Sequence, residues 1–100
     1  MQYTVKQTKD FVLVQLSGRL TSEDHRAFAE IVSRLSKAGD RHVIFDAGAV
    51  EYIDSSGFGM LIVANETAYR AGGEFRVRRA PDQFKQLARR VRAAHLMRID

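Results

Sequence analysis

A pair of serines followed by a glycine stands near the middle of the chain, in the segment from Ile53 to Gly59. An apolar strand-like run precedes the pair and a long helical run follows it, so a serine hydroxyl is expected at a helix start. The first backbone N–H groups of a helix lack partners within it, and with the helix dipole they favour bound negative charge. A phosphoryl group would be stabilised there. Alternatively, Ser55 or Ser56 simply caps the helix and the glycines ease close packing.

The composition limits the classes of protein to consider. One hundred residues, 45% of them hydrophobic, predict a single domain over residues 1–100 with a modest core. No run approaches the roughly 20 apolar residues of a membrane span and no signal peptide is visible, so we expect a cytoplasmic protein without membrane contact. The absence of cysteine excludes disulfides and thiolate chemistry. The formal net charge of +4 permits acidic partners without showing any.

The elements before the serine turn are read from periodicity. Residues 3–5 and 11–16 are rich in β-formers and predict a β-hairpin, which Gly18 is expected to end. Thr21 and Asp24 form a variant of the capping box ahead of an amphipathic helix that should end near Gly39. The apolar face of this helix comprises Ala27, Phe28, Ile31, Val32 and Leu35. A short strand over residues 41–46 follows.

After the turn, a helix mostly apolar around its girth runs from Ser56 to Gly72. Phe75 and Val77 alternate with polar residues and predict a strand. Pro81 opens a last helix, expected to reach Ala94, with an apolar stripe of Phe84, Leu87 and Val91, and residues 96–99 predict an edge strand. The order β-β-α-β-α-β-α-β predicts an α/β fold with a mixed, mostly parallel sheet packed with helices.

This order of elements, with Gly18-Arg19-Leu20 closing the second strand and the turn Asp54-Ser55-Ser56-Gly57, resembles a STAS domain of the anti-sigma factor antagonist type. The resemblance covers nearly the whole chain, and its specific part is the Asp-Ser-Ser-Gly turn. It implies a bacterial partner-switching protein. Carried over by position, it implies that Ser55 accepts phosphate from an anti-sigma factor with serine kinase activity, and that a metal-dependent serine phosphatase of the PP2C type removes it.

The residues around Ser55 suit such a role. Gly57 and Gly59 keep bulk away from the hydroxyl and let another backbone approach, and Asp54 could orient it. Ser55 needs no base of its own, because the kinase supplies the ATP, the metal and the catalytic carboxylate. We therefore expect a substrate rather than an enzyme, without catalytic residues, cofactor or metal. Unphosphorylated Ser55 would permit binding of the histidine-kinase-like serine kinase, and phosphorylation would release it.

The surface that binds the partner should surround the turn. Phe58 and Ile62 lie four residues apart on one helix face and are candidates for exposed apolar anchors, with burial of Phe58 as the alternative. Met60, Leu61 and Ala64 are assigned to the core. Thr21 and Ser22 follow the second strand and are candidates for the same interface, with helix capping as their alternative role. These candidates come from sequence spacing alone.

Two features depart from the pattern of many antagonists. Gly18-Arg19-Leu20-Thr21 stands where those proteins carry Gly-Glu-Leu-Asp, so the loop that faces the kinase lacks their acids. Lys85, Arg89 and Arg92 form a basic stripe on the last helix, interpreted either as a solvated face or as a docking site for an acidic partner.

Other classes fit less well. A serine hydrolase would need a base, but the three histidines fall on different predicted elements and lack metal-ligand spacing. The arginines lack an aromatic interleave, which argues against nucleic-acid binding. The main alternative is a STAS subunit that is not phosphorylated and has a structural role in an ABC transporter or signalling assembly.

Overall fold

A computed structural model describes all 100 residues. Five strands and three α-helices alternate along the chain, with a short 3₁₀ turn, η1, at Ser22–Asp24. The strands are β1 (Gln2–Gln7), β2 (Phe11–Leu20), β3 (His42–Ile53), β4 (Glu74–Arg78) and β5 (Arg98–Ile99). The helices are α1 (His25–Leu35), α2 (Ser55–Arg70) and α3 (Asp82–Arg90). The predicted order of elements is confirmed.

The strands form one sheet in the order β1-β2-β3-β4-β5. β1 and β2 make the predicted antiparallel hairpin, whereas β2, β3, β4 and β5 pair in parallel. Parallel neighbours require crossover connections, and α1, α2 and α3 supply them. The mixed, mostly parallel sheet predicted from the sequence is thereby confirmed.

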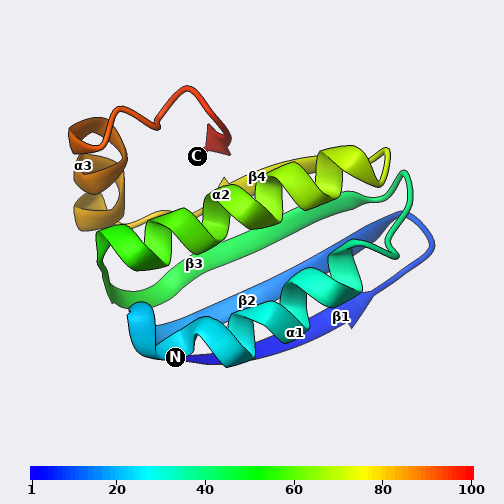
Figure 1. Cartoon of the computed structure of the whole chain (residues 1–100), viewed down its shortest axis with the longest axis horizontal. Helices are drawn as coiled ribbons and strands as arrows, with labels where there is room; N and C mark the ends of the chain where they lie inside the picture. The colour runs from blue at the N-terminus through cyan, green and yellow to red at the C-terminus, as the bar shows by residue number, and fades with distance from the viewer.

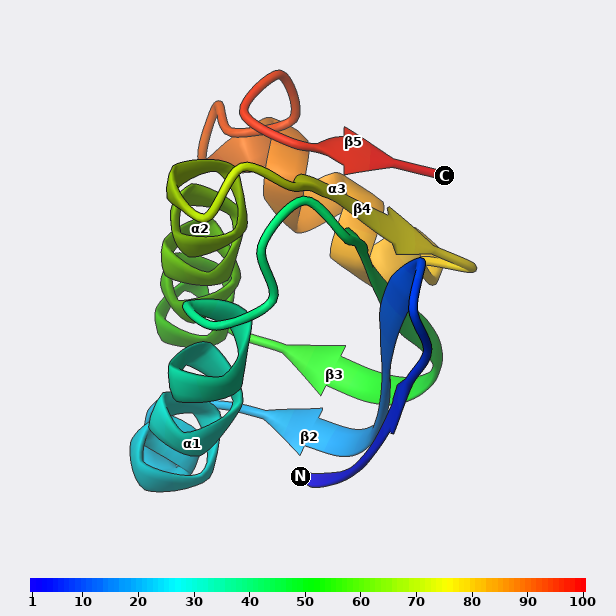
Figure 2. The same cartoon turned by 90° about the vertical axis from the view of Figure 1, so that its right-hand side faces the viewer.

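The helices α1 and α2 lie side by side on one face of the sheet, and α3 lies near the start of α2 (Figure 1). Figure 2 shows the layers edge-on, with α1 and α2 together on one side of the strands. Alternate strand residues point into this helix-covered layer, and the ring of Phe45 on β3 lies 5.9 Å from that of Phe28 and 5.1 Å from that of Phe75. Burial of these rings makes the sheet-helix interface the core.

Three expectations about element ends were wrong. Gly18 does not end β2: the strand runs on to Leu20, and Gly18 adopts φ +83° where the pairing with β3 shifts register. A glycine accommodates that left-handed backbone without a Cβ penalty. β3 is also longer than predicted, because it extends through residues 47–53 and delivers the chain directly to the serine turn.

The last helix is shorter than predicted. α3 ends at Arg90, and Arg92 lies beyond it with φ +57°, so Lys85, Arg89 and Arg92 do not form one helical stripe. Val91 is exposed, and Ala88 rather than Val91 joins Phe84 in the core. The predicted apolar stripe therefore holds only in its first part.

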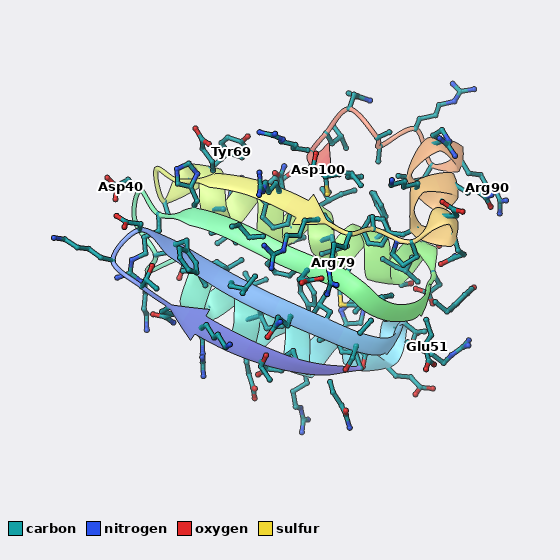
Figure 3. The ribbon with its side chains drawn as sticks, turned by 180° about the vertical axis from the view of Figure 1, so that it is seen from behind. Asp40, Glu51, Tyr69, Arg79, Arg90 and Asp100 are labelled. Atoms are coloured by element: carbon teal, nitrogen blue, oxygen red, sulfur yellow. The ribbon has the colours of Figure 1, made fainter.

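A buried carboxylate tethers the segment after β4. Asp46 on β3 is 3% exposed and accepts hydrogen bonds from Arg79 Nε at 3.0 Å and Arg79 Nη2 at 3.1 Å. Its Oδ1 also accepts from the Gly48 amide at 2.9 Å. Figure 3 shows Arg79 over the sheet face opposite α1 and α2. The guanidinium occupies the space that a Cβ at Gly48 would need.

We expect Asp46 to make stability depend on pH in the acid range. Burial alone would raise the pKa of Asp46, but the hydrogen bonds from Arg79 and Gly48 and the charges of Arg79 and Arg78 outweigh it and hold the pKa below its usual value. The stabilisation is thus complete above the unfolded-state pKa of about 3.9 and is lost as the pH falls through the folded-state pKa.

Asp46→Asn should cost about 1–3 kcal/mol of unfolding free energy at pH 7. Urea denaturation at pH 7 and near pH 3 should show that the difference in unfolding free energy between the wild type and Asp46→Asn becomes smaller in acid. An equal gap at both pH values would contradict the ion pair as its source.

Candidate functional site

The serine turn joins β3 to α2, and Asp54 is the residue that caps the helix. Asp54 has an extended backbone, and its Oδ1 accepts a hydrogen bond from the Gly57 amide at 2.7 Å. The expectation that Ser55 or Ser56 fills the cap was therefore wrong, because the carboxylate one residue earlier takes that role. Ser55 and Ser56 occupy the first two helical positions, and both are exposed.

The turn is held tightly against the end of β2. The Asp54 amide donates to the Leu20 carbonyl at 3.2 Å, and a Cβ at Gly57 would collide with that same carbonyl oxygen. Gly57 therefore permits close packing of the turn against β2, which was the alternative role considered for the glycines, and its part in giving a kinase access to Ser55 stays a prediction. Gly59 has no such neighbour, since a Cβ there would meet nothing within 4 Å.

Sequence reasoning missed Gln83, which fixes the turn from the other side. Gln83 on α3 donates from Nε2 to the Ile53 carbonyl at 2.8 Å and accepts from the Ile53 amide at 3.0 Å. The side-chain amide thus pairs with the last residue of β3 as a neighbouring strand would. No local signal marks this role, because it depends on where α3 packs.

Gln83→Ala should loosen the serine turn. Both backbone groups of Ile53 would lose their partner, so we expect a loss of about 1–3 kcal/mol in unfolding free energy. Hydrogen exchange at residues 53–57 should accelerate along with it. Gln86→Ala, on the exposed side of the same helix, is the matched control and should change neither quantity. Equal effects of the two variants would argue against the clamp.

Thr21 and Ser22 directly follow Leu20, whose carbonyl accepts the hydrogen bond from the Asp54 amide of the turn, and η1 contacts α2. Thr21 Oγ1 accepts from the Glu23 amide at 3.4 Å, and Asp24 Oδ2 accepts from the Thr21 amide at 2.8 Å. This reciprocal pair is the predicted capping box. Ser22 is exposed. A role of either residue in binding a partner stays a prediction.

Phe58 does not serve as an exposed anchor. Its side chain is 1% exposed, and its ring centroid lies 5.5 Å from that of Phe84 on α3. The interpretation of Phe58 as an exposed anchor was therefore wrong, because Phe84 on α3 packs against its ring. Ile62 is half-buried against the core. Met60, Leu61 and Ala64 are buried as predicted.

Two hollows flank the serine turn, and sequence reasoning found neither. An apolar groove of about 400 Å³ lies between α1 and α2; its lining comprises His25, Phe28, Ala29, Val32, Ser56, Gly59, Met60 and Val63. Val63 is 49% exposed. On the other side, a hollow of about 520 Å³ includes Ser55 with Tyr52, Leu87, Arg90 and Val91. The Arg19 guanidinium lies 4.5 Å from the centroid of the Tyr52 ring.

The turn presents hydroxyls without activating them. No hydrogen bond joins Ser55 or Ser56 Oγ to a histidine or a carboxylate, whereas a nucleophilic serine requires an adjacent base. His25 begins α1, His42 begins β3 and His95 follows α3, so the histidines share no element.

Comparison with solved structures defines the fold. The anti-sigma factor antagonist SpoIIAA in its unphosphorylated form has a TM-score of 0.76 and 19% identity, covering 99% of this chain and 88% of that one. The phosphorylated form of SpoIIAA from Bacillus gives 0.71 and 18%, covering 99% and 91%. A sulfate transporter family protein from Wolinella succinogenes gives 0.73 and 13%, covering 87% and 73%. The chain therefore has the STAS fold.

A match over nearly the whole sequence shows which family the chain belongs to. A family model described as "Mlab, STAS domain" matches residues 3–98. The chain belongs to this STAS domain family, which confirms the resemblance seen in the sequence. Comparison with curated proteins finds no match. None of the three helices has both the length and the apolar character that crossing a membrane requires.

Proposed function

We propose that this domain is a phosphorylation-controlled partner-switching regulator of the anti-sigma factor antagonist type. With Ser55 free, it binds an anti-sigma factor or histidine-kinase-like serine kinase; with Ser55 phosphorylated, it releases that partner. The observation that supports the proposal most is that the helix cap and the exposed hydroxyl belong to different residues of the turn. Asp54 caps α2, so the hydroxyl of Ser55 is not needed for capping, and Ser55 is exposed at the first helical position.

Phosphorylation would change the surface more than the fold. A phosphoryl group adds about −1.5 to −2 charges at neutral pH. At the first turn of α2 the helix dipole and the Ser55 and Ser56 amides, which have no acceptor within the helix, stabilise that charge. A partner that covers the turn would have to bury the phosphoryl charge next to Asp54. Charge repulsion and the cost of desolvation would then cause the partner to dissociate. A serine phosphatase of the PP2C type would restore binding.

The two hollows support a contact surface on both sides of Ser55. The α1–α2 groove offers apolar area next to Ser56, and the hollow beside α3 offers Tyr52, Leu87 and Val91 next to Ser55. Thr21 and Ser22 border the same turn, and Ile62 contributes partly buried apolar surface. We propose that the partner covers this region.

The choice of serine provides a direct test. Ser56→Ala should still be phosphorylated in cells of the source organism, whereas Ser55→Ala should not, as read by gel shift and peptide mass spectrometry. Both side chains are exposed, so neither change should alter folding. If Ser56→Ala were not phosphorylated and Ser55→Ala still were, the assignment of Ser55 as the acceptor would be overturned.

A second candidate is a fixed STAS subunit without phosphorylation, in a transporter or signalling assembly. The likeness to a sulfate transporter family protein favours it, since the same fold occurs there. The intact Asp54-Ser55-Ser56-Gly57 turn favours the switch instead. Stable co-purification with an ABC-transporter ATPase, unchanged by Ser55→Asp, would decide for the fixed subunit.

A further inference from the structure

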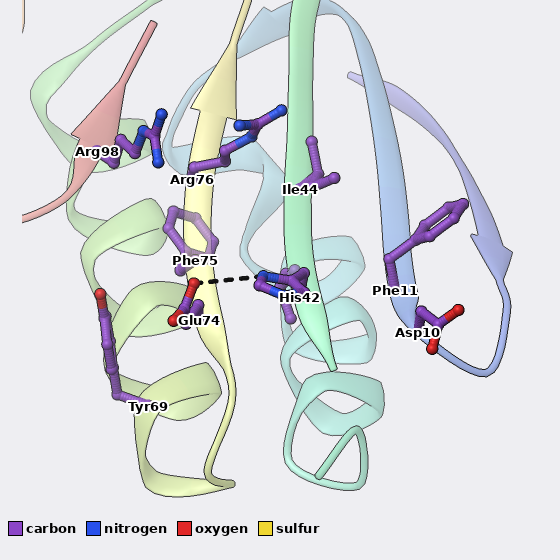
Figure 4. Close-up of a pocket in the computed structure, with 10 residues that line it drawn as sticks. Asp10, Phe11, His42, Ile44, Tyr69, Glu74, Phe75, Arg76 and Arg98 are labelled. Atoms are coloured by element: carbon purple, nitrogen blue, oxygen red, sulfur yellow. Dashed lines mark ion pairs between the residues drawn. The ribbon is translucent and has the colours of Figure 1, made fainter. Parts of the chain in front are cut away.

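Two arginines occupy neighbouring positions on β4 and β5, at one edge of the sheet. In the register of β4 and β5, Arg76 lies directly opposite Arg98, and Ile44 on β3 lies opposite Arg76 on its other side. Figure 4 shows Arg76 and Arg98 adjacent on neighbouring strands, with Ile44 beside them. Two guanidinium groups on neighbouring strands repel each other, and a bound anion would reduce that repulsion.

The protein itself only partly neutralises the pair. Asp100 is the carboxylate nearest to both, with Oδ2 at 4.0 Å from Arg76 Nη1 and Oδ1 at 3.7 Å from Arg98 Nε. Neither distance is that of a charge-assisted hydrogen bond, which spans about 2.7–2.9 Å. Arg76 Nε is buried without a hydrogen-bond partner, so it is not itself open to a ligand. The Arg76 and Arg98 side chains are 38% and 69% exposed, which leaves other donors of their guanidinium groups facing solvent.

The arginines border a hollow of about 520 Å³, which is within the usual range for a small-molecule site of about 300–1,000 Å³. Phe11 and Ile44, both half-buried, supply apolar surface. At the opposite end, His42 Nδ1 and Glu74 Oε2 lie 3.3 Å apart (Figure 4), and Asp10 also lines the hollow. The hollow is therefore basic at one end, apolar in part and acidic at the other end.

We propose that this hollow binds a small organic anion with one carboxylate or phosphate group and an apolar body. The anionic group would lie between Arg76 and Arg98, and the body would contact Ile44 and Phe11. The acids at the far end, Glu74 and Asp10, would disfavour a second negative group there. The site is separate from the Ser55 turn and does not depend on the proposed switch.

Phenyl phosphate, benzoate and inorganic phosphate are the probes, titrated into the ¹⁵N-labelled protein at low salt. Phenyl phosphate or benzoate should shift the amides of Ile44, Arg76 and Arg98 and bind at least about tenfold more tightly than inorganic phosphate, because only the organic probes bury apolar surface. Which of the two binds better distinguishes phosphate from carboxylate recognition. A probe with a second carboxylate, 4-carboxyphenyl phosphate, should bind more weakly than phenyl phosphate.

Arg76→Gln and Arg98→Gln should each lower the affinity for the organic probes about tenfold, as expected for loss of a charged hydrogen bond. Arg26→Gln, on the exposed side of α1, is the matched control and should leave binding unchanged. Circular dichroism should show all three variants folded, since Arg26 and Arg98 are exposed and the half-buried Arg76 has only a 4.0 Å ion pair to lose. Shifts confined to residues 54–57, or affinity unchanged in both sheet variants, would overturn the site.

Discussion

Ser55→Asp should weaken partner binding by roughly thirtyfold or more while leaving the domain folded. The substitution places a fixed negative charge where the partner would seat, and an unpaired charge in an interface costs about 2 kcal/mol or more, roughly thirtyfold in affinity. The same charge at the first position of α2 is favourable for the helix, so the thermal midpoint should stay equal or rise slightly. Ser55→Ala should hold the partner constitutively.

Affinity capture with the two variants, followed by titration of the recovered partner, measures this difference. Ser33→Asp adds the same charge on the exposed face of α1 and serves as the control for a general effect of charge. Equal binding by Ser55→Ala and Ser55→Asp would contradict the switch. A fall in thermal midpoint for Ser55→Asp would instead point to a structural role for the hydroxyl.

Gly57→Ala should be among the most destabilising single changes at the turn. Its Cβ would collide with the Leu20 carbonyl oxygen, which also accepts the Asp54 amide, so β2 and the turn would have to separate. We expect a loss of about 3 kcal/mol in unfolding free energy, as for other overpacked sites. Urea denaturation would measure it.

Gly59→Ala is the matched control, two residues along the same helix. Nothing lies within 4 Å of its Cβ position, and alanine is a better helix former than glycine, so this change should stabilise the domain by about 0.5–1 kcal/mol. Opposite signs for two identical substitutions would establish the close approach at Gly57. The same sign for both would contradict it.

The sequence predicted the fold because its periodic signals are strong and agree with one another. The hairpin, the amphipathic α1 and the alternating β4 each bury the residues that their periods indicated. The length of β3 was missed because its second half contains Ala47, Gly48 and Ala49, whose small side chains carry little strand signal. The ends of the strands and helices depend on contacts with neighbouring elements, and the hydrophobic periodicity of a segment carries no information about those contacts.

The position of the serine turn between a strand and a helix was predicted correctly, whereas several contacts around it were not. The turn and the need for Gly57 followed from local chemistry, whereas the choice of Asp54 over the serines as cap depended on the backbone path out of β3. Phe58 and Gln83 were misread or missed because α3 determines their environment. Contacts between segments about 30 residues apart leave no local pattern to read.

The proposed switch requires that Ser55 carry a reversible phosphoryl group. Intact and peptide mass spectrometry of the protein isolated from its own cells, grown under two conditions and treated or not with a serine phosphatase, tests it most directly. We predict one phosphoryl group on Ser55 that the phosphatase removes. Ser55 unmodified in every condition would contradict the switch and favour the fixed STAS subunit.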